Sequence, residues 1–368
     1  MVHIAFTGGG TGGHIYPGLA AASYIQKQGN YRIFWIGSNK GMDRSIVEGA
    51  GLEFFGIPSG KLRRYFSLQN CSDAFKAGAG FFAARKILQR EKPALLFSKG
   101  GFVSVPPCTA AASLGIPVFT HESDVSPGLA TKINLRFARK IFTAYEETAG
   151  FLGESYTNKI IVSGNPVRPE FRSADPAKGR AFLGIKDGER ILLVLGASQG
   201  ARQINELVRE TLNELTKYYT VVHQVGPHTE WDVKAGEKYR PYPFFKEEMP
   251  HVLAAAELVL GRSGAGTLWE CAVLGRPMVL IPLSGSGTRG DQVENARFFE
   301  NAGAAVSLTA DILSPGSLIG TIVSIALDPA KRNRLAAASA RLGATDGAKL
   351  IADTLMHEAM PDHHRKPV

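Results

Sequence analysis

The chain has 368 residues and carries 42 Lys and Arg against 33 Asp and Glu, a formal net charge of +9. Its hydrophobic content of 44% excludes an intrinsically disordered chain, and its length predicts two domains. The basic excess favours an acidic partner, such as nucleotide phosphates or anionic lipid headgroups.

The first predicted element is a buried strand over Ile4–Phe6, followed by a glycine-rich turn, Gly8–Gly13, and a helix after Pro17. A strand, a glycine turn and a helix start point backbone N–H groups at an anion. Gly8, Gly10 and Gly13 have the G-x-G-x-x-G spacing, but no carboxylate ends the second strand, as a dinucleotide site requires. No G-K-[ST] follows, which excludes a P-loop. The alternative is a tight turn without a ligand.

The rest of the first half alternates short apolar runs with helical patterns, which is typical of a doubly wound parallel sheet. Strands are predicted at 33–36, 53–57, 94–97, 117–120, 140–143 and 160–162, and helices at 42–48, 73–89 and 103–114.

The alternation of predicted strands and helices is interrupted at Gly164–Pro169. It resumes with the strand Ile191–Leu195, the glycine turn Gly196–Ala201 and a helix over Arg202–Leu215. Later strands are predicted at 220–223, 258–260, 278–281 and 304–307, and closing helices at 318–327, 330–342 and 348–357. We therefore predict α/β architecture with two Rossmann-like domains, 1–163 and 164–342, facing across a cleft. Ligands of such sheets bind outside the carboxyl ends of the strands.

A second helix N-terminus that could bind an anion follows the strand predicted at 258–260. Gly264 to Thr267 would begin a helix over Leu268–Leu274, with Glu270 in its first turn. Glu270 either complements the helix dipole as a capping carboxylate or accepts from ribose hydroxyls.

A polar, glycine-rich loop, Pro282–Gly290, leads into a predicted helix that contains Gln292 and Asn295. Gln292 and Asn295 are three residues apart and share a face, so the paired amides could bind sugar hydroxyls. Arg168, beside two prolines at the domain junction, could bind a diphosphate or form an interdomain salt bridge.

The sequence shows no pattern typical of a zinc site, a membrane span or a nucleic-acid-binding site. Cys71, Cys108 and Cys271 are scattered, so we expect reduced buried thiols and no zinc site. His363 and His364 lie in a polar tail that we expect to be disordered. No apolar run spans a bilayer, no signal peptide is expected, and no nucleic-acid motif is present.

Seven segments, in this order along the chain, resemble the MurG family, the UDP-N-acetylglucosamine transferases that add the second sugar of the lipid-linked peptidoglycan precursor. The segments are GGGTGGHIYPG (8–18), SKGGFVSVP (98–106), HESDVSPGL (121–129), GNPVR (164–168), GASQGAR (196–202), RSGAGTLWE (262–270) and TRGDQVENA (288–296). Some members carry Asn at Asp124 and Leu at Gly266, which we interpret as subgroup differences.

The resemblance implies a GT-B glycosyltransferase whose last helix, about 343–368, packs back on the first domain. It implies inverting transfer of N-acetylglucosamine from UDP-GlcNAc to the 4-hydroxyl of lipid I. We expect no cofactor, and nothing in the sequence demands a metal, because no D-x-D motif ends a strand and helix N-termini can neutralise the diphosphate instead. In the family, donor contacts fall at the positions of Arg168, Ser198, Lys246 (backbone), Ala265, Gly266, Thr267, Glu270 and Gln292, with Asn295 beside them. Thr11, Gly12 and Gly13 would face the acceptor diphosphate and the donor sugar, and Phe102 is a further candidate.

A base must take the proton of the acceptor hydroxyl. His14 is our candidate, because it lies at the glycine turn and titrates near neutral pH. His14 could equally serve as a positioning hydrogen-bond partner, and Glu122 and Asp124 are alternative bases.

The lipid acceptor implies contact with the cytoplasmic membrane face, and other cell-wall or division proteins are candidate partners. Lys61–Phe66 mixes basic and aromatic residues, and Phe75, Phe81 and Phe82 lie near Lys76, Arg85 and Lys86 on one helical pattern. This composition suits an interfacial patch, while core phenylalanines with solvated charges are the alternative.

Two rival functions remain open. A UDP-GlcNAc 2-epimerase or another sugar transferase could use a similar fold, and an epimerase would need no acceptor. A protein that senses nucleotide sugar at a membrane would bind UDP-GlcNAc without turnover.

Overall fold

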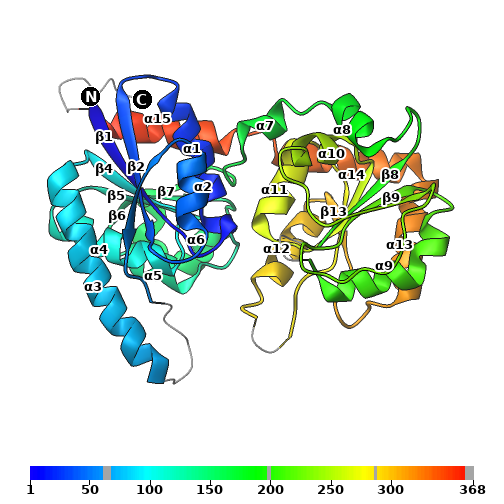
Figure 1. Cartoon of the computed structure of the whole chain (residues 1–368), viewed down its shortest axis with the longest axis horizontal. Helices are drawn as coiled ribbons and strands as arrows, with labels where there is room; N and C mark the ends of the chain where they lie inside the picture. The colour runs from blue at the N-terminus through cyan, green and yellow to red at the C-terminus, as the bar shows by residue number, and fades with distance from the viewer. Residues whose placement is uncertain (61–67, 197–199, 286–287, 361–368) are drawn as a thin grey trace. The chain divides into compact units, whose positions relative to one another are not determined.

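The chain folds into two compact units, each a parallel sheet with helices against its faces (Figure 1). In the computed structural model the described residues are 1–60, 68–196, 200–285 and 288–360, with side chains of the long third helix described from Phe75. The first unit comprises Met1–Arg168 and the chain from Asp346, and the second comprises Pro169–Thr345. Residues 164–168, which we assigned to the second domain, therefore belong to the first unit.

The first unit is built on a seven-stranded sheet of order β3-β2-β1-β4-β5-β6-β7, with parallel pairing throughout. Its strands are β1 (Val2–Thr7), β2 (Tyr31–Ser38), β3 (Glu53–Ile57), β4 (Leu95–Ser98), β5 (Val118–Glu122), β6 (Ala138–Thr143) and β7 (Ile160–Val162). Its helices are η1 (Gly12–His14), α1 (Tyr16–Gln26), α2 (Asp43–Gly49), α3 (Leu68–Glu91), η2 (Phe102–Ser104), α4 (Val105–Ser113), α5 (Leu129–Asn134), α6 (Thr148–Leu152), η3 (Glu154–Lys159) and α15 (Gly347–Ala359).

The second unit has a six-stranded parallel sheet of order β10-β9-β8-β11-β12-β13. Its strands are β8 (Ile191–Leu195), β9 (Thr220–Gln224), β10 (Tyr239–Tyr242), β11 (Leu258–Gly261), β12 (Met278–Leu280) and β13 (Ala305–Ser307). Its helices are α7 (Pro169–Arg172), α8 (Pro176–Leu183), α9 (Arg202–Leu215), α10 (Met249–Ala255), α11 (Ala265–Val273), α12 (Asp291–Asn301), α13 (Pro315–Leu327) and α14 (Pro329–Leu342).

The strand β8, at the centre of the second sheet, is apolar along its whole length, as expected for a strand that helices cover on both faces. Ile191–Leu195, with the sequence ILLVL, is buried at every residue. Parallel sheets need this double burial, and they therefore read as continuous apolar runs rather than as alternating ones. The predicted doubly wound fold class is confirmed in both units.

The last helix, α15, returns to the first unit and packs on α1. Its Asp346 N-cap accepts from Lys349 N at 3.0 Å and from the Tyr24 hydroxyl at 2.6 Å. Ile351 and Leu355 are fully buried in the same core as Phe6 and Trp35. Each fully buried side chain of this size contributes about 1.5–3 kcal/mol, so this packing fastens the end of the chain to the first sheet.

One strand has no counterpart among our sequence predictions. β10 contains Pro241, which removes a backbone donor and argues against a strand. β10 lies at the edge of its sheet and pairs only with β9 among the described strands, so the missing donor costs no ladder bond on its open side.

Candidate active site

Each sheet changes winding direction once, and the segments that follow the strands at that point carry many of the predicted site residues. In the first unit the change lies between β1 and β4, whose loops begin at Gly8 and Lys99. In the second unit it lies between β8 and β11, whose loops begin at Gly196 and Arg262. Doubly wound sheets bind ligands outside the strand ends at this position. We call the two loop pairs the first corner and the second corner.

The glycines of the first corner are required by close packing. A Cβ on Gly9 would lie 1.9 Å from Asp43 Oδ2. Gly10 has a φ of +84°, and a Cβ there would lie 2.6 Å from the Phe102 ring, which is where the structure places that candidate residue. Thr11 and Gly13 are exposed and Gly12 is half-buried, so these three residues form the outer surface of the corner.

A buried carboxylate that we did not single out from the sequence fastens the first corner. Asp43 is fully buried at the start of α2. Its Oδ1 accepts from Gly10 N at 3.0 Å, and its Oδ2 accepts from Ser38 N at 2.9 Å. Asp43 lies just beyond the end of β2. A dinucleotide site would place a carboxylate at that strand end, facing a ribose, whereas the Asp43 carboxylate binds the glycine turn.

His14 ends η1 and is half-buried beside the loop that follows β4. A Cβ built on Gly101 would lie 2.9 Å from His14 Cδ2, and one on Gly100 would lie 3.9 Å from His14 Nδ1. The imidazole is therefore in contact with the Gly100–Gly101 segment, at the point where the two loops of the first corner meet.

Lys99 is the second charged group buried in the first corner, at 1% exposure. Its Nζ donates to Ser123 Oγ at 2.6 Å, and Ser123 Oγ donates to Asn165 Oδ1 at 2.7 Å. Burial lowers the pKa of the Lys99 ammonium to about 8, while Glu122 and Asp124 act to raise it.

The carboxylate of Glu122 shapes the turn after β5. Its Oε1 accepts from Ser123 N at 2.8 Å and from Asp124 N at 3.1 Å, and its Oε2 accepts from Gly128 N at 3.0 Å. Glu122 is 6% exposed, whereas Asp124 is half-buried. Burial, together with the Lys99 ammonium, holds the pKa of the neighbouring His121 imidazole well below its usual value.

Arg168 lies over the first residue of α1. Its guanidinium carbon is 5.3 Å from the centre of the Tyr16 ring, a cation–π arrangement. The half-buried Arg168 side chain is thereby held beside the helix that the first corner begins.

The second corner also depends on glycine. Gly200 has a φ of +83°, and a Cβ there would lie 2.4 Å from Val225 O. The turn that contains it leads into α9 at Arg202. Ser198, our predicted diphosphate contact in this turn, lies outside the described residues.

α11 begins three residues earlier than we predicted. Gly264 is its N-cap, and Ala265, Gly266 and Thr267 form its first turn without a side-chain cap. Glu270 therefore lies in the second turn, and our placement of it in the first turn is wrong. A carboxylate there is past the first-turn N–H groups, which weakens the capping interpretation.

The loop before α11 is held by α12. Ser263 Oγ donates to Gln292 O at 2.7 Å, and Asn295 Nδ2 donates to Ser263 O at 3.3 Å. Asn295 is fully buried. Gln292 is half-buried, and its Oε1 accepts from Leu283 N at 3.0 Å.

Two further groups border the second corner. Arg262 Nη1 donates to Gln203 Oε1 and to Ile281 O, both at 3.0 Å, so this guanidinium braces α9 against the end of β12. Lys246 is exposed, and its backbone N–H donates to Glu248 Oε2 at 3.2 Å.

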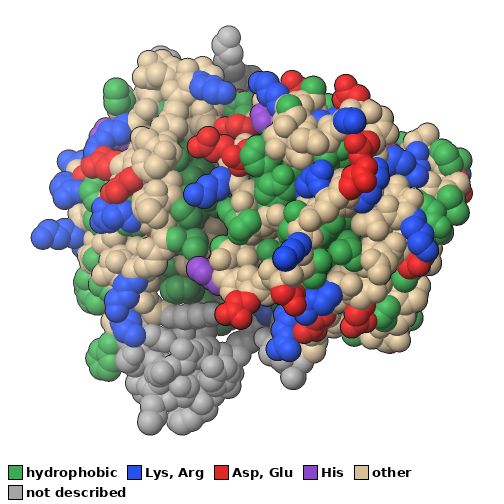
Figure 2. All heavy atoms as spheres, turned by 45° about the vertical axis from the view of Figure 1, so that its right-hand side comes forward, with side chains coloured by type: hydrophobic (Ala, Val, Ile, Leu, Met, Phe, Trp, Pro, Cys, Tyr) green, Lys and Arg blue, Asp and Glu red, His purple; other side chains and the backbone are tan. Residues whose placement is uncertain are grey.

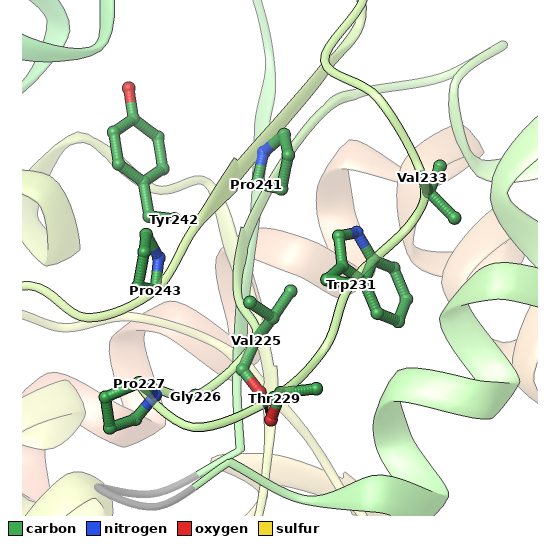
Figure 3. Close-up of a pocket in the computed structure, with 9 residues that line it drawn as sticks. All are labelled: Val225, Gly226, Pro227, Thr229, Trp231, Val233, Pro241, Tyr242 and Pro243. Atoms are coloured by element: carbon green, nitrogen blue, oxygen red, sulfur yellow. Dashed lines mark hydrogen bonds between the residues drawn. The ribbon is translucent and has the colours of Figure 1, made fainter.

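A separate pocket of about 280 Å³ opens beside β10 in the second unit (Figure 3). Its lining residues come from β10 and from the segment after β9: Val225, Gly226, Pro227, Thr229, Trp231, Val233, Pro241, Tyr242 and Pro243. None of these residues is among our predicted site residues, so the pocket is distinct from the second corner's helix start.

The described residues gather no metal-ligating cluster, and the face drawn in Figure 2 gathers no basic stripe. No group of three or more His, Cys, Asp or Glu residues there could hold a metal ion. On the face drawn in Figure 2, Lys and Arg side chains are interspersed with acidic ones rather than gathered in a stripe.

Comparison with known proteins identifies the family. The chain matches the glycosyltransferase family 28 N-terminal domain over residues 4–143 and the family 28 C-terminal domain over residues 191–351. A Treponema denticola protein named UDP-N-acetylglucosamine–N-acetylmuramyl-(pentapeptide) pyrophosphoryl-undecaprenol N-acetylglucosamine transferase is 48% identical over 381 residues, 96% of this chain and 97% of that protein. The chain belongs to this transferase family.

Solved structures agree on the fold. MurG of Acinetobacter baumannii has a TM-score of 0.70 over 97% of this chain and 99% of its own, at 22% identity. UDP-GlcNAc 2-epimerase of Neisseria meningitidis bound to UDP-GlcNAc has a TM-score of 0.67 over 97% of this chain and 100% of its own, at 14% identity. The MurG-family chain thus has the predicted GT-B type of fold, which both a transferase and an epimerase share.

Proposed function

We propose that the chain moves N-acetylglucosamine from UDP-GlcNAc to the 4-hydroxyl of the N-acetylmuramoyl residue of lipid I, giving lipid II and UDP. The 48% identity to a transferase of that name, over 96% of the chain, carries this proposal. The acceptor oxygen forms a bond to C1 of the sugar as the C1–O bond to UDP breaks. The hydroxyl proton passes to a base, and UDP leaves with the electron pair.

We assign the donor to the second corner. The first-turn N–H groups of α11, at Ala265, Gly266 and Thr267, suit the diphosphate and would offset the charge that develops on the leaving UDP. Glu270, in the second turn, is assigned to the ribose hydroxyls. Ser198 remains the predicted diphosphate contact of the glycine turn.

The amides of α12 take different roles in this proposal. The Gln292 oxygen already accepts from Leu283 N, so its two N–H groups are the donors that it offers to the sugar. Asn295 is buried on Ser263 O, and we assign it to holding the loop before α11. At Lys246 the N–H donates to Glu248 Oε2 at 3.2 Å and the carbonyl accepts from Met249 N at 3.4 Å, and we assign this backbone to the donor.

We assign the acceptor diphosphate to the first corner, over Thr11, Gly12 and Gly13. The resemblance assigns Arg168 to the donor, but we reassign it to this diphosphate because its guanidinium is held over Tyr16 at the start of α1. His14 is the proposed base, since it is half-buried where the two loops of this corner meet. Glu122 fits the role poorly, because three backbone N–H groups already occupy its carboxylate oxygens. Asp124 is the alternative base.

Contact with a membrane surface is proposed for α3. Phe75 is 82% exposed and Phe82 is 71% exposed, near the exposed Lys76 and Lys86, whereas Phe81 packs on the core. The first part of α3 extends past the edge of the sheet (Figure 1). Exposed rings beside lysines suit the headgroup region of an anionic bilayer. The Lys61–Phe66 segment lies outside the described residues, and no described helix combines the length and apolarity that crossing a bilayer requires.

The test is UDP release by the full chain with UDP-GlcNAc, with and without lipid I. We expect release only when lipid I is present, together with a disaccharide lipid product. Conversion of UDP-GlcNAc alone into an epimer would instead identify an epimerase. Binding of UDP-GlcNAc without turnover, with lipid I supplied, would identify a sensor and contradict the proposal.

The membrane assignment has its own test. Phe82→Ser should weaken sedimentation of the chain with anionic phospholipid vesicles, while Phe182→Ser, which changes an exposed ring of the second unit, should not. Equal binding by both variants and the unaltered chain would remove α3 from the proposal.

A further inference from the structure

Lys99 is a buried cation without a role in the reaction as described above. An ammonium at 1% exposure has lost nearly all of its water, and such burial is costly unless other groups replace the solvent. A methionine of similar length would avoid that cost. The sequence nevertheless places a lysine directly after β4, under the glycine turn, with its Cβ 3.2 Å from a Cβ built on Gly8.

The hydrogen bonds of Lys99 run in one direction through three loops. The Lys99 ammonium donates to the Ser123 hydroxyl at 2.6 Å, and that hydroxyl donates to the Asn165 amide oxygen at 2.7 Å. Lys99 follows β4, Ser123 follows β5 and Asn165 follows β7. A hydroxyl has one proton to donate, so accepting from the ammonium leaves that proton for Asn165. These two consecutive hydrogen bonds therefore fix three loops at the same edge of the sheet.

The charged groups around Lys99 belong to the proposed acceptor site. Glu122 and Asp124, on the turn after β5, both interact electrostatically with its ammonium, and the ammonium interacts with His121. His14 reaches the same segment from the glycine turn, where Gly100 and Gly101 contact its ring. Ser123 is the residue between the two carboxylates.

We propose that Lys99 is a positioning residue for acceptor chemistry: through Ser123 it holds the turn that carries Glu122 and Asp124 against the first corner. This inference rests on the proposed transferase function. The residue acts through Ser123 and does not touch the substrate. Its charge also interacts with Asp124, the alternative base, and can therefore influence the proton that this carboxylate takes up.

The experiment is a double-mutant cycle on the full chain with Lys99→Met and Ser123→Ala, measured by UDP release with lipid I in detergent micelles. Lys99→Met should lower kcat by roughly 100-fold, the size expected when reacting groups are displaced by about 1 Å. Ser123→Ala should lower it by roughly tenfold, the loss of one hydrogen bond. The double variant should be no worse than Lys99→Met alone, within about threefold, because both changes break one linkage.

Two readouts separate positioning from a purely structural role. Loss of a nearby cation raises the pKa of a base, whether that base is a carboxylate or an imidazole. The acid limb of kcat/KM should therefore move to higher pH in Lys99→Met, by roughly half a unit to one unit. Ser123→Thr, which keeps the hydroxyl, should retain kcat within about threefold.

Controls make every outcome decisive. Lys27→Met removes an exposed lysine from the same unit and should leave kcat and the pH profile unchanged. All variants should bind UDP-GlcNAc like the unaltered chain, because the donor is assigned to the second unit. Ser123→Ala removes one oxygen from a half-buried side chain, so it tests the linkage even where Lys99→Met lowers the yield of folded protein.

Two results would overturn the inference: wild-type kcat and pH profile in Lys99→Met, or losses that multiply in the double variant. Absence of lipid I-dependent turnover in the unaltered chain would instead refute the proposed function itself.

Discussion

The two units bring similar elements to their corners but fix them by different means. The first corner is held between buried charges, Asp43 on the glycine turn and Lys99 beneath it. The second is held by Ser263, which bonds to α12 through Gln292 O and Asn295 Nδ2, and by the half-buried Arg262 guanidinium, which donates to neutral oxygens. An uncapped helix start remains in the second corner, whereas Asp43 already engages a backbone N–H in the first.

This difference suits two ligands with different demands. An open helix start favours a diphosphate that gains charge as a leaving group, which is the donor's behaviour. The first corner contains His14, and the turn after β5 carries Asp124, the alternative base, which suits removal of a proton from an acceptor. The comparison therefore supports the assignment of UDP-GlcNAc to the second unit and lipid I to the first.

Asp43→Ala is expected to have the largest effect on stability, and only in the first unit. It leaves the N–H groups of Gly10 and Ser38 without their carboxylate acceptor, at about 1–3 kcal/mol for each buried unsatisfied group. Hydrogen exchange followed by mass spectrometry should show lost protection in peptides around 1–40. UDP-GlcNAc affinity should not change.

Asp353→Ala is the control for that variant, since this carboxylate forms a surface ion pair with Lys349 in the same unit. Little change in exchange is expected, because such pairs contribute little. Equal loss of protection in both units after Asp43→Ala would contradict the separate roles of the corners.

Glu270→Ala should weaken UDP-GlcNAc binding by roughly 100-fold, the loss of charge-assisted hydrogen bonds to a ribose. Titration calorimetry with UDP-GlcNAc measures the dissociation constant without the acceptor. The exposed Glu247→Ala, which keeps the net charge of the two variants equal, should bind normally. Unaltered affinity in Glu270→Ala would remove this residue from the donor site.

Asn295→Ala should weaken UDP-GlcNAc binding less, by roughly tenfold, since it loses one hydrogen bond and acts through the Ser263 loop. The double variant Asn295→Ala with Ser263→Ala should show losses that do not multiply, because both contribute to the same loop. A loss in Asn295→Ala as large as in Glu270→Ala would favour direct contact of Asn295 with the sugar.

One buried histidine should also affect the pH dependence of stability. His223 in the second core bonds to Tyr239 Oη at 3.0 Å and Asn205 Oδ1 at 3.1 Å, and burial lowers its pKa to about 3. Protonation therefore favours the unfolded state, and stability that is present above pH 6.5 is lost as pH falls toward 3. The loss is about 1.4 kcal/mol per pH unit.

His223→Gln removes this titration and should flatten the decline of the unfolding free energy between pH 6.5 and 5, as measured by urea unfolding. An identical slope in the variant would show that His223 does not contribute to acid sensitivity.

The fold was predictable from sequence because local patterns of apolar residues specify most of its strands and helices. Continuous apolar runs such as Ile191–Leu195 allow only strands buried on both faces, and α9 begins and ends at the residues that its spacing predicts. β10 could not be found in this way, because Pro241 is tolerated only through its edge position, which depends on the whole sheet.

The candidate site was predictable where glycine and motif spacing specify it, and not where distant residues meet. Glycine turns and helix starts are visible in the sequence. Asp43 reaches Gly10 across 33 positions, and Lys99 reaches Ser123 across 24, so neither contact leaves a local pattern. The start of α11 was placed too late because Gly264 and Gly266 resemble a loop, although only Gly264 lies outside the helix.

The central claim is that the second corner binds the sugar nucleotide. A crystal structure of the full chain with UDP-GlcNAc tests it most directly. We expect the diphosphate at the first turn of α11, with the ribose against Glu270 and the Gln292 amide on the sugar. A uridine diphosphate bound instead at Thr11–Gly13 of the first corner would contradict the account.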